Sequence, residues 1–203
     1  MKKGWLAGLG CLGLILLAVL VGGLWLRGIY NDLVAQQQNV QAQWSQVENV
    51  YQRRVDLIPN LVATVKGYAS HEATVLEDVA RSRSQAGSIR LTPELLNNPA
   101  EFQKFQQAQN SLSGALSRLL AVAENYPDLK ANQNFLTLQN QLEGTENRIA
   151  VERRRFNEAA QAYNTRIMQF PTNLVARSFG FQEKPYFQAA AGSEKAPTVD
   201  FTK

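Results

Sequence analysis

The stretch from Val40 to Val65, VQAQWSQVENVYQRRVDLIPNLVATV, decides the fold. Its apolar residues recur in steps of three and four with Gln, Asn, Glu and Arg between them, which is the pattern of one face of a long α-helix. The predicted face consists of Val40, Trp44, Val47, Tyr51, Val55, Ile58, Val62 and Val65. Because the pattern keeps its phase across Pro59, we expect a kink there and not a turn. The chain is predicted to reverse later, between Gly67 and Ser70.

Three further amphipathic helices are predicted after this reversal. The first covers about residues 70–87, with Ser70 as a favourable N-cap, and a loop rich in Asn, Pro and Thr follows over residues 87–99. The next helix covers about 99–125, and the last keeps its apolar face from Phe135 to Ile167. The predicted fold class is therefore all-α, an antiparallel four-helix bundle that continues from an N-terminal single-pass transmembrane helix.

An apolar segment without charged residues, Trp5–Leu26, precedes the bundle. As a helix it would span about 33 Å, close to the roughly 30 Å hydrocarbon core of a bilayer. A signal anchor over residues 1–27 is predicted in preference to a cleaved signal peptide, because the apolar run is long and no A-x-A-like site follows it. Residues 28–188 are predicted to form the bundle with an aromatic C-terminal segment, and 189–203 a disordered tail.

The excess positive charge of the chain lies beside this anchor. The formal net charge is +4, from 21 basic and 17 acidic residues, and Lys2, Lys3 and Arg27 flank the apolar segment. Without these three, 18 basic residues face 17 acidic ones, so a nucleic-acid-binding surface is not expected. Because two of the three lie on the N-terminal side, we expect a cytoplasmic N-terminus and an extracytoplasmic bundle at the plasma membrane.

Mostly small side chains line one face of the predicted membrane helix, at Gly4, Gly8, Ala18 and Gly22, with Cys11 and Ile15 completing the spacing. Such a face lets two helices approach closely and predicts self-association within the bilayer. The alternative interpretation is that glycine is simply frequent in membrane helices.

Residues that could support catalysis or bind a metal ion are sparse. His71-Glu72-Ala73-Thr74-Val75 begins like a zinc-binding helix motif, but Val75 stands where the second histidine is required and the chain has one histidine. One cysteine excludes an intramolecular disulfide framework and a Cys/His metal site. The run Arg153–Arg155 fits a solvated helix face, because three consecutive helix residues point in different directions. No catalytic residue, cofactor or metal site is expected, and the chain is predicted not to be an enzyme.

The segment after the last predicted helix concentrates aromatic residues. Phe170-Pro171 is expected to end that helix, and Phe179, Phe181, Tyr186 and Phe187 follow within a short distance. Such residues either pack back onto the membrane-proximal end of the bundle, or dock into the lipid interface or a partner's groove. These four are the candidate docking residues.

Several stretches resemble the LemA family, and together they cover the chain from about Lys2 to Phe187. They are Gln43-Trp44-Ser45-Gln46-Val47, Gln52 to Val62, Val65 to Glu72, Tyr163-Asn164-Thr165-Arg166, Phe170-Pro171-Thr172-Asn173 and Phe179-Gly180-Phe181. The resemblance implies a bacterial-type, single-pass membrane protein with a helical-bundle domain and no established catalytic residues. One branch of that family is associated with building magnetosome membranes, which implies a role in membrane organisation or envelope assembly.

These expectations favour a membrane-anchored, non-enzymatic interaction or scaffold protein. Its expected partners are the lipid bilayer, further copies of the chain and an unidentified membrane or envelope protein. A ligand-sensing extracytoplasmic bundle is the alternative, although such sensors usually send a second membrane helix back across the bilayer, and the sequence holds one apolar span.

Overall fold

The computed structural model describes residues 2–69 and 71–189, with side chains from Leu12 onward. Over these residues the chain forms six α-helices and one 3-10 helix and no strand, so the prediction of an all-α protein is confirmed. The helical segments are α1 (Lys2–Tyr68), α2 (Ala73–Ser88), η1 (Pro93–Asn97), α3 (Pro99–Ala123), α4 (Pro127–Lys130), α5 (Gln133–Met168) and α6 (Thr172–Ser178).

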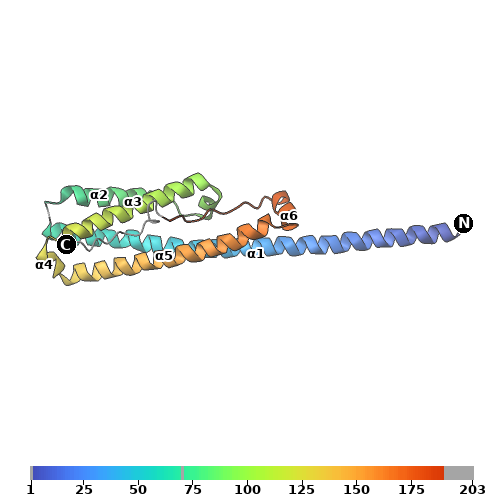
Figure 1. Cartoon of the computed structure of the whole chain (residues 1–203), viewed down its shortest axis with the longest axis horizontal. Helices are drawn as coiled ribbons and strands as arrows, with labels where there is room; N and C mark the ends of the chain where they lie inside the picture. The colour runs from blue at the N-terminus through green and yellow to red at the C-terminus, as the bar shows by residue number, and fades with distance from the viewer. Residues whose placement is uncertain (1, 70, 190–203) are drawn as a thin grey trace, which may run out of the picture. The chain divides into compact units, whose positions relative to one another are not determined.

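Helix α1 is one uninterrupted helix that contains both the apolar N-terminal segment and the stretch from Val40 to Val65 (Figure 1). Pro59 lies inside it without ending it, although a proline at this position removes one backbone hydrogen bond. The helix ends at Tyr68, within the region where the reversal was predicted.

The buried face of α1 differs from the predicted one at two positions. Arg54 and Leu61 are buried, whereas their neighbours Val55 and Val62 are only partly buried. The buried positions alternate in steps of four and three, the spacing that keeps one side of a helix against its neighbours over a long distance. They are Val40, Trp44, Val47, Tyr51, Arg54, Ile58, Leu61 and Val65.

The helices after α1 agree with the predicted ranges to within a few residues. Helix α2 begins at Ala73 with Glu72 as its N-cap residue, whereas the predicted cap, Ser70, lies outside the described residues. Asn98 caps α3, and its side chain accepts a hydrogen bond from the Glu101 amide at 3.2 Å. The short segments η1, α4 and α6 were not predicted, because a helix of seven residues or fewer is too short to show a periodic pattern.

The chain divides into two compact units, and α1 and α5 each contribute to both. The anchor unit consists of residues up to Ala42 together with Ala159–Lys184. The helical unit consists of Gln43–Glu158 together with the residues from Pro185 onward. In the helical unit α2 lies beside α3 (Figure 1).

Candidate functional site

The N-terminal part of α1 has the surface of a membrane helix. Among the residues with described side chains, α1 is the one helix that is long and apolar enough to cross a membrane. Its large apolar side chains are exposed from Leu12 to Leu26. A helix that is apolar on all sides matches a hydrocarbon environment.

The small-residue face of this segment is open in its described part. Ala18 is exposed, Gly22 is partly exposed, and a Cβ atom added at Gly22 would meet no atom within 4 Å. The side-chain surroundings of Gly4 and Gly8 lie outside the described residues. Self-association through this face therefore stays a prediction.

Just beyond the apolar segment, the C-terminal part of the anchor unit contacts α1 through an aromatic clamp of Tyr30, Phe179 and Phe181. The ring centroids of Tyr30 and Phe179 are 5.1 Å apart, and those of Tyr30 and Phe181 are 5.7 Å apart, both edge to face. This geometry is the preferred one for aromatic pairs. Two of the four candidate docking residues, Phe179 and Phe181, thus both contact the ring of Tyr30 on α1.

Gly180 makes the clamp possible. Its φ of +75° is the left-handed conformation that ends many helices, and here it ends α6. The Phe181 amide donates to the Ala176 carbonyl at 2.9 Å, and the Gly180 amide to the Arg177 carbonyl at 3.4 Å. This capping pattern turns the chain so that the aromatic residues before and after Gly180 both reach Tyr30.

An ion pair joins α1 and α5 next to the clamp. Arg166 Nε donates to Asp32 Oδ2 at 2.7 Å, and both side chains are partly exposed. The hydrogen bond from Arg166 lowers the pKa of the Asp32 carboxyl, against a smaller opposing effect of burial. Asp32 therefore stays ionised at neutral pH and holds α5 to α1.

A buried asparagine holds the extended segment that follows the clamp. Asn164 Nδ2 donates to the Lys184 carbonyl and the Lys184 amide donates to Asn164 Oδ1, both at 2.8 Å. The Lys184 Nζ lies 5.8 Å from the ring centroid of Tyr163, and burial lowers the pKa of this ammonium. Burial also raises the pKa of the Tyr163 phenol to about 12.

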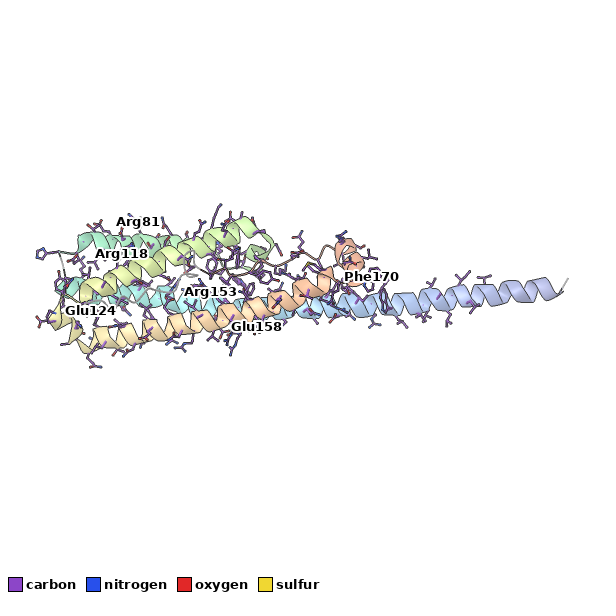
Figure 2. All side chains as sticks on the ribbon, viewed as in Figure 1. Arg81, Arg118, Glu124, Arg153, Glu158 and Phe170 are labelled. Atoms are coloured by element: carbon purple, nitrogen blue, oxygen red, sulfur yellow. The ribbon has the colours of Figure 1, made fainter. Side chains whose placement is uncertain are left out.

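Four large apolar side chains are exposed on α6 and its flanks. We call Met168, Phe170, Leu174 and Phe179 the elbow patch; Phe170, labelled in Figure 2, lies in the bend between α5 and α6. Met168, Phe170 and Leu174 were not among the predicted docking residues. Leu174 is followed directly by the buried Val175, so the residue types alone do not show which of the two is exposed.

The two remaining candidate docking residues belong to the helical unit, and one of them is a core residue. Phe187 is buried, with its ring 5.0 Å from that of Phe102 and 5.5 Å from that of Phe156. Trp44 also contacts Phe187, at 6.2 Å between ring centroids, and donates its indole N–H to the Leu91 carbonyl at 3.0 Å. Phe187 thus packs inside the helical unit.

Asn157 holds the backbone of Phe187 in the way that Asn164 holds Lys184. Its Nδ2 donates to the Phe187 carbonyl at 3.0 Å, and its Oδ1 accepts from the Phe187 amide at 2.9 Å. Tyr186 is exposed, and its carbonyl accepts a hydrogen bond from Gln106 at 3.1 Å.

A buried arginine forms a polar layer inside the helical unit. Arg54 Nη1 donates to Ser113 Oγ and to Glu146 Oε1, each at 2.9 Å, and Arg54 Nη2 donates to Gln109 Oε1. These partners come from α3 and α5, so one side chain of α1 links three helices. The sequence offered one signal for this layer: Arg54 lies on the strict four-three spacing of α1.

The arginine run on α5 is divided between two environments. Arg154 and Arg155 are exposed, as predicted, and pair with Glu158 at 3.7 Å and Glu152 at 2.9 Å. Arg153 instead donates to the Tyr51 hydroxyl at 2.5 Å, and its guanidinium lies 4.9 Å from the ring centroid of Phe187. The interpretation of the whole run as a solvated face was therefore wrong for Arg153. Burial raises the pKa of the Tyr51 phenol, so this hydroxyl stays protonated at neutral pH.

His71 is exposed, and the part of the chain with described side chains contains no group of three His, Cys, Asp or Glu residues that could hold a metal ion. A cleft of about 320 Å³ in the helical unit is lined by side chains that include Glu48, Tyr51, Arg90 and Gln109.

The model of the LemA family matches residues 43–201. The chain belongs to the LemA family. The matched region includes most of the helical unit. It contains Arg54 with its partners on α3 and α5, and the aromatic rings that contact Trp44.

Several proteins are similar to this chain over most of its length. Two proteins of Paramagnetospirillum magneticum named magnetosome protein MamQ are 30% identical over 175 residues, 78% of this chain and 64% of theirs. Protein LemA of Metamycoplasma hominis is 27% identical over 163 residues, 80% of this chain and 70% of its own. The chain thus spans slightly less than two thirds of the length of the magnetosome relatives.

Proposed function

We propose that this LemA-family chain is a membrane-anchored, non-enzymatic interaction protein that takes part in membrane or envelope organisation. The observation that carries the proposal is the continuity of α1, which supplies both the apolar candidate span and the buried face of the helical unit. The similarity to proteins named as magnetosome proteins supports a role at a membrane.

In this proposal the helical unit is an antiparallel four-helix bundle of α1, α2, α3 and α5. Two observations support it: Trp44 on α1 contacts Phe105 on α3 and Phe156 on α5, and α2 lies beside α3. The domain limits stay as predicted, with an anchor over 1–27, a bundle with its aromatic segment over 28–188 and a tail over 189–203. The N-terminus is cytoplasmic, the chain self-associates, and its further partner is a membrane or envelope protein.

Alkaline carbonate extraction of membranes tests the anchoring. The unchanged chain is expected to stay in the pellet, whereas Leu16→Arg combined with Leu20→Arg is expected to move to the supernatant, because arginine is costly in hydrocarbon. Leu136→Arg, an exposed leucine of the helical unit, is the matched control and should stay in the pellet. Recovery of the full-length, unchanged chain in the supernatant would overturn the proposal.

Cysteine labelling tests the orientation. In a Cys11→Ala background, Ala35→Cys places an exposed thiol beyond the apolar segment. Labelling of intact cells by a membrane-impermeant maleimide is expected. Labelling only after lysis would place the helical unit in the cytoplasm.

The cleft beside Tyr51 favours a second candidate, a ligand-sensing bundle. Its lining combines Glu48, Arg90 and Gln109 with an aromatic ring, the mixture of polar and apolar groups found in small-molecule sites. A small molecule that raises the Tm of the unchanged chain but not that of Arg90→Ala would support this candidate.

A further inference from the structure

We propose that the elbow patch, made by Met168, Phe170, Leu174 and Phe179, inserts into the lipid interface of the bilayer that α1 crosses. This inference rests on the proposed anchoring and adds a second point of membrane contact. We expect the patch to contact lipid headgroups. We do not expect it to bind a second copy of the chain or another protein.

The exposure of the patch singles it out. The exposed fractions of Met168, Phe170, Leu174 and Phe179 are 56%, 80%, 58% and 62%. Among the described residues beyond Leu26, no other large apolar side chain is more than half exposed. Exposed large apolar side chains that are concentrated in one short segment, residues 168–179, indicate a site that contacts a partner or a membrane.

The other side of α6 is packed inside the anchor unit. Thr172, Val175 and Ala176 are buried, whereas Leu174, Arg177 and Ser178 are exposed, so α6 has an inner face and an outer face on which Leu174 is the large apolar residue. The position of the outer face is fixed by the cap at Gly180 and by the clamp on Tyr30. The patch is thus held at the surface by the buried residues of α6 and by the contact of Phe179 with Tyr30.

The depth of the patch matches the headgroup region. Tyr30 lies four residues after Leu26, which is about 6 Å along a helix. The interfacial layer on each side of the hydrocarbon core is roughly 5–7 Å thick. The Phe179 ring centroid lies 5.1 Å from that of Tyr30. When the apolar segment fills the core, Phe179 is therefore within that distance of the depth of Tyr30, a range that overlaps the headgroup region.

The apolar surface of the patch also continues that of the candidate span. Trp25 and Leu26 are exposed at the end of the apolar segment, and Tyr30 follows one turn later, partly exposed and in contact with Phe179. An apolar surface that adjoins a lipid-facing helix is already next to the bilayer when that helix is inserted. This continuity therefore favours contact with lipid over contact with a protein partner.

The charges of the anchor unit complement anionic headgroups. Arg27, three residues before Tyr30, and Arg177, two residues before Phe179, are exposed. The acidic residues of the unit are Asp32, which is paired with Arg166, and Glu183. Basic residues beside an inserted apolar surface attract anionic lipids and strengthen its binding.

Depth-dependent quenching in vesicles of phosphatidylethanolamine and phosphatidylglycerol tests the insertion. The full chain carries Cys11→Ala, and single cysteines introduced by Phe170→Cys, Leu174→Cys and Phe179→Cys are labelled with an environment-sensitive dye. We expect blue-shifted emission at all three positions and stronger quenching by nitroxides near the headgroup than by nitroxides deep in the acyl chains.

Two matched positions of the same unit calibrate the measurement. Leu20→Cys lies within the apolar segment and should be quenched most by deep nitroxides. Ala35→Cys is exposed nine residues beyond Leu26, about 13 Å along the helix, and should be quenched by aqueous iodide alone. Circular dichroism of each variant confirms that the helices are retained.

Three outcomes distinguish the possibilities. If Leu20→Cys is quenched by lipid but the patch positions respond only to iodide, the elbow is in water and the inference is wrong. If the patch positions are shielded from both iodide and lipid nitroxides, they contact protein, and the inference is also wrong. If Leu20→Cys itself escapes lipid quenching, the proposed anchoring fails, and the elbow inference fails with it.

Discussion

Arg54 and Glu146 form an ion pair at 2.9 Å in which the cation is buried and the anion reaches solvent, with exposed side-chain fractions of 1% and 39%. Arg54 is therefore the residue whose charge would be costly without its partner, because its side chain is buried whereas that of Glu146 reaches solvent. If its partner is removed, a charge remains inside the helical unit with only neutral acceptors, Ser113 and Gln109.

Glu146→Ala should lower the free energy of unfolding by about 3 kcal/mol, because breaking a buried pair leaves an uncompensated charge. Glu143→Ala, at an exposed position one turn earlier, should change it by less than about 0.5 kcal/mol. The double variant Arg54→Met with Glu146→Ala should recover most of the loss. Urea denaturation of the full chain in detergent, followed by circular dichroism, provides the measurement. Equal stability of the two glutamate variants would contradict the assignment.

Phe187→Ala should destabilise the helical unit by about 3 kcal/mol or more, because it removes a buried ring from the cluster around Trp44. Tyr186→Ala, at the exposed neighbour, should cost much less, within about 1 kcal/mol. The urea midpoints of the two variants give the comparison. A Phe187→Ala variant as stable as Tyr186→Ala would mean that the aromatic segment does not pack inside the unit in solution.

Gly180→Ala should destabilise the anchor unit by about 1 kcal/mol, the cost of a left-handed conformation for a residue with a Cβ atom. The added Cβ meets nothing within 4 Å, so backbone conformation alone sets this cost. Gly67→Ala is the control, because Gly67 lies in α1 with equally open surroundings, and there alanine should stabilise by up to about 1 kcal/mol. Thermal unfolding of the two variants provides the measurement. If Gly180→Ala and Gly67→Ala shift the Tm in the same direction, the left-handed cap at Gly180 is contradicted.

Arg166→Gln should raise the pKa of the Asp32 carboxyl toward its ordinary value of 3.8, because the guanidinium lowers it. A carboxyl with a lowered pKa stabilises the fold above its unfolded-state pKa and loses this contribution as the pH falls through its folded-state value. The difference between the two proteins should therefore be present at pH 7 and absent well below pH 3.8. Because both side chains are partly exposed, it should not exceed about 1 kcal/mol. A stability difference that persists in acid would contradict this cause.

Ala18→Leu combined with Gly22→Leu should abolish self-association if the small-residue face brings two anchors together. Gly13→Leu, which lies off that face, should leave it intact. Co-purification of two differently tagged copies from one cell reports the result. Unchanged recovery of the second copy from the double variant would rule this face out.

Much of the fold was predictable, and Arg54 shows where prediction failed. The long helix, its continuation through Pro59 and the ranges of α3 and α5 follow from apolar periodicity alone. The predicted face of α1 included Val55 and Val62, whereas Arg54 and Leu61 are the buried residues. A charged side chain such as that of Arg54 is rarely buried without partners. Only the partners on α3 and α5 explain the burial, and no local pattern reveals partners so distant in sequence.

The aromatic segment could be recognised from the sequence, but the environments of its residues could not be predicted. The aromatic residues near residue 180 indicate a contact surface, yet Phe179 is exposed and Phe187 is buried, although both are phenylalanines in a short segment. Their environments depend on the turn at Gly180 and on the hydrogen bonds from Asn157. Met168 and Leu174 became part of the patch through the packing of α6, which the sequence did not predict.

Two asparagines of α5, Asn157 and Asn164, form hydrogen bonds of the kind that pair neighbouring strands. A primary amide carries a donor and an acceptor in the same plane, as a peptide group does, so each asparagine satisfies both backbone groups of one extended residue, Phe187 or Lys184. An extended segment with unpaired amides would offer an open edge to another chain. At Phe187 and Lys184 the backbone amide and carbonyl already have partners in the same chain, so these residues offer no open edge to another chain.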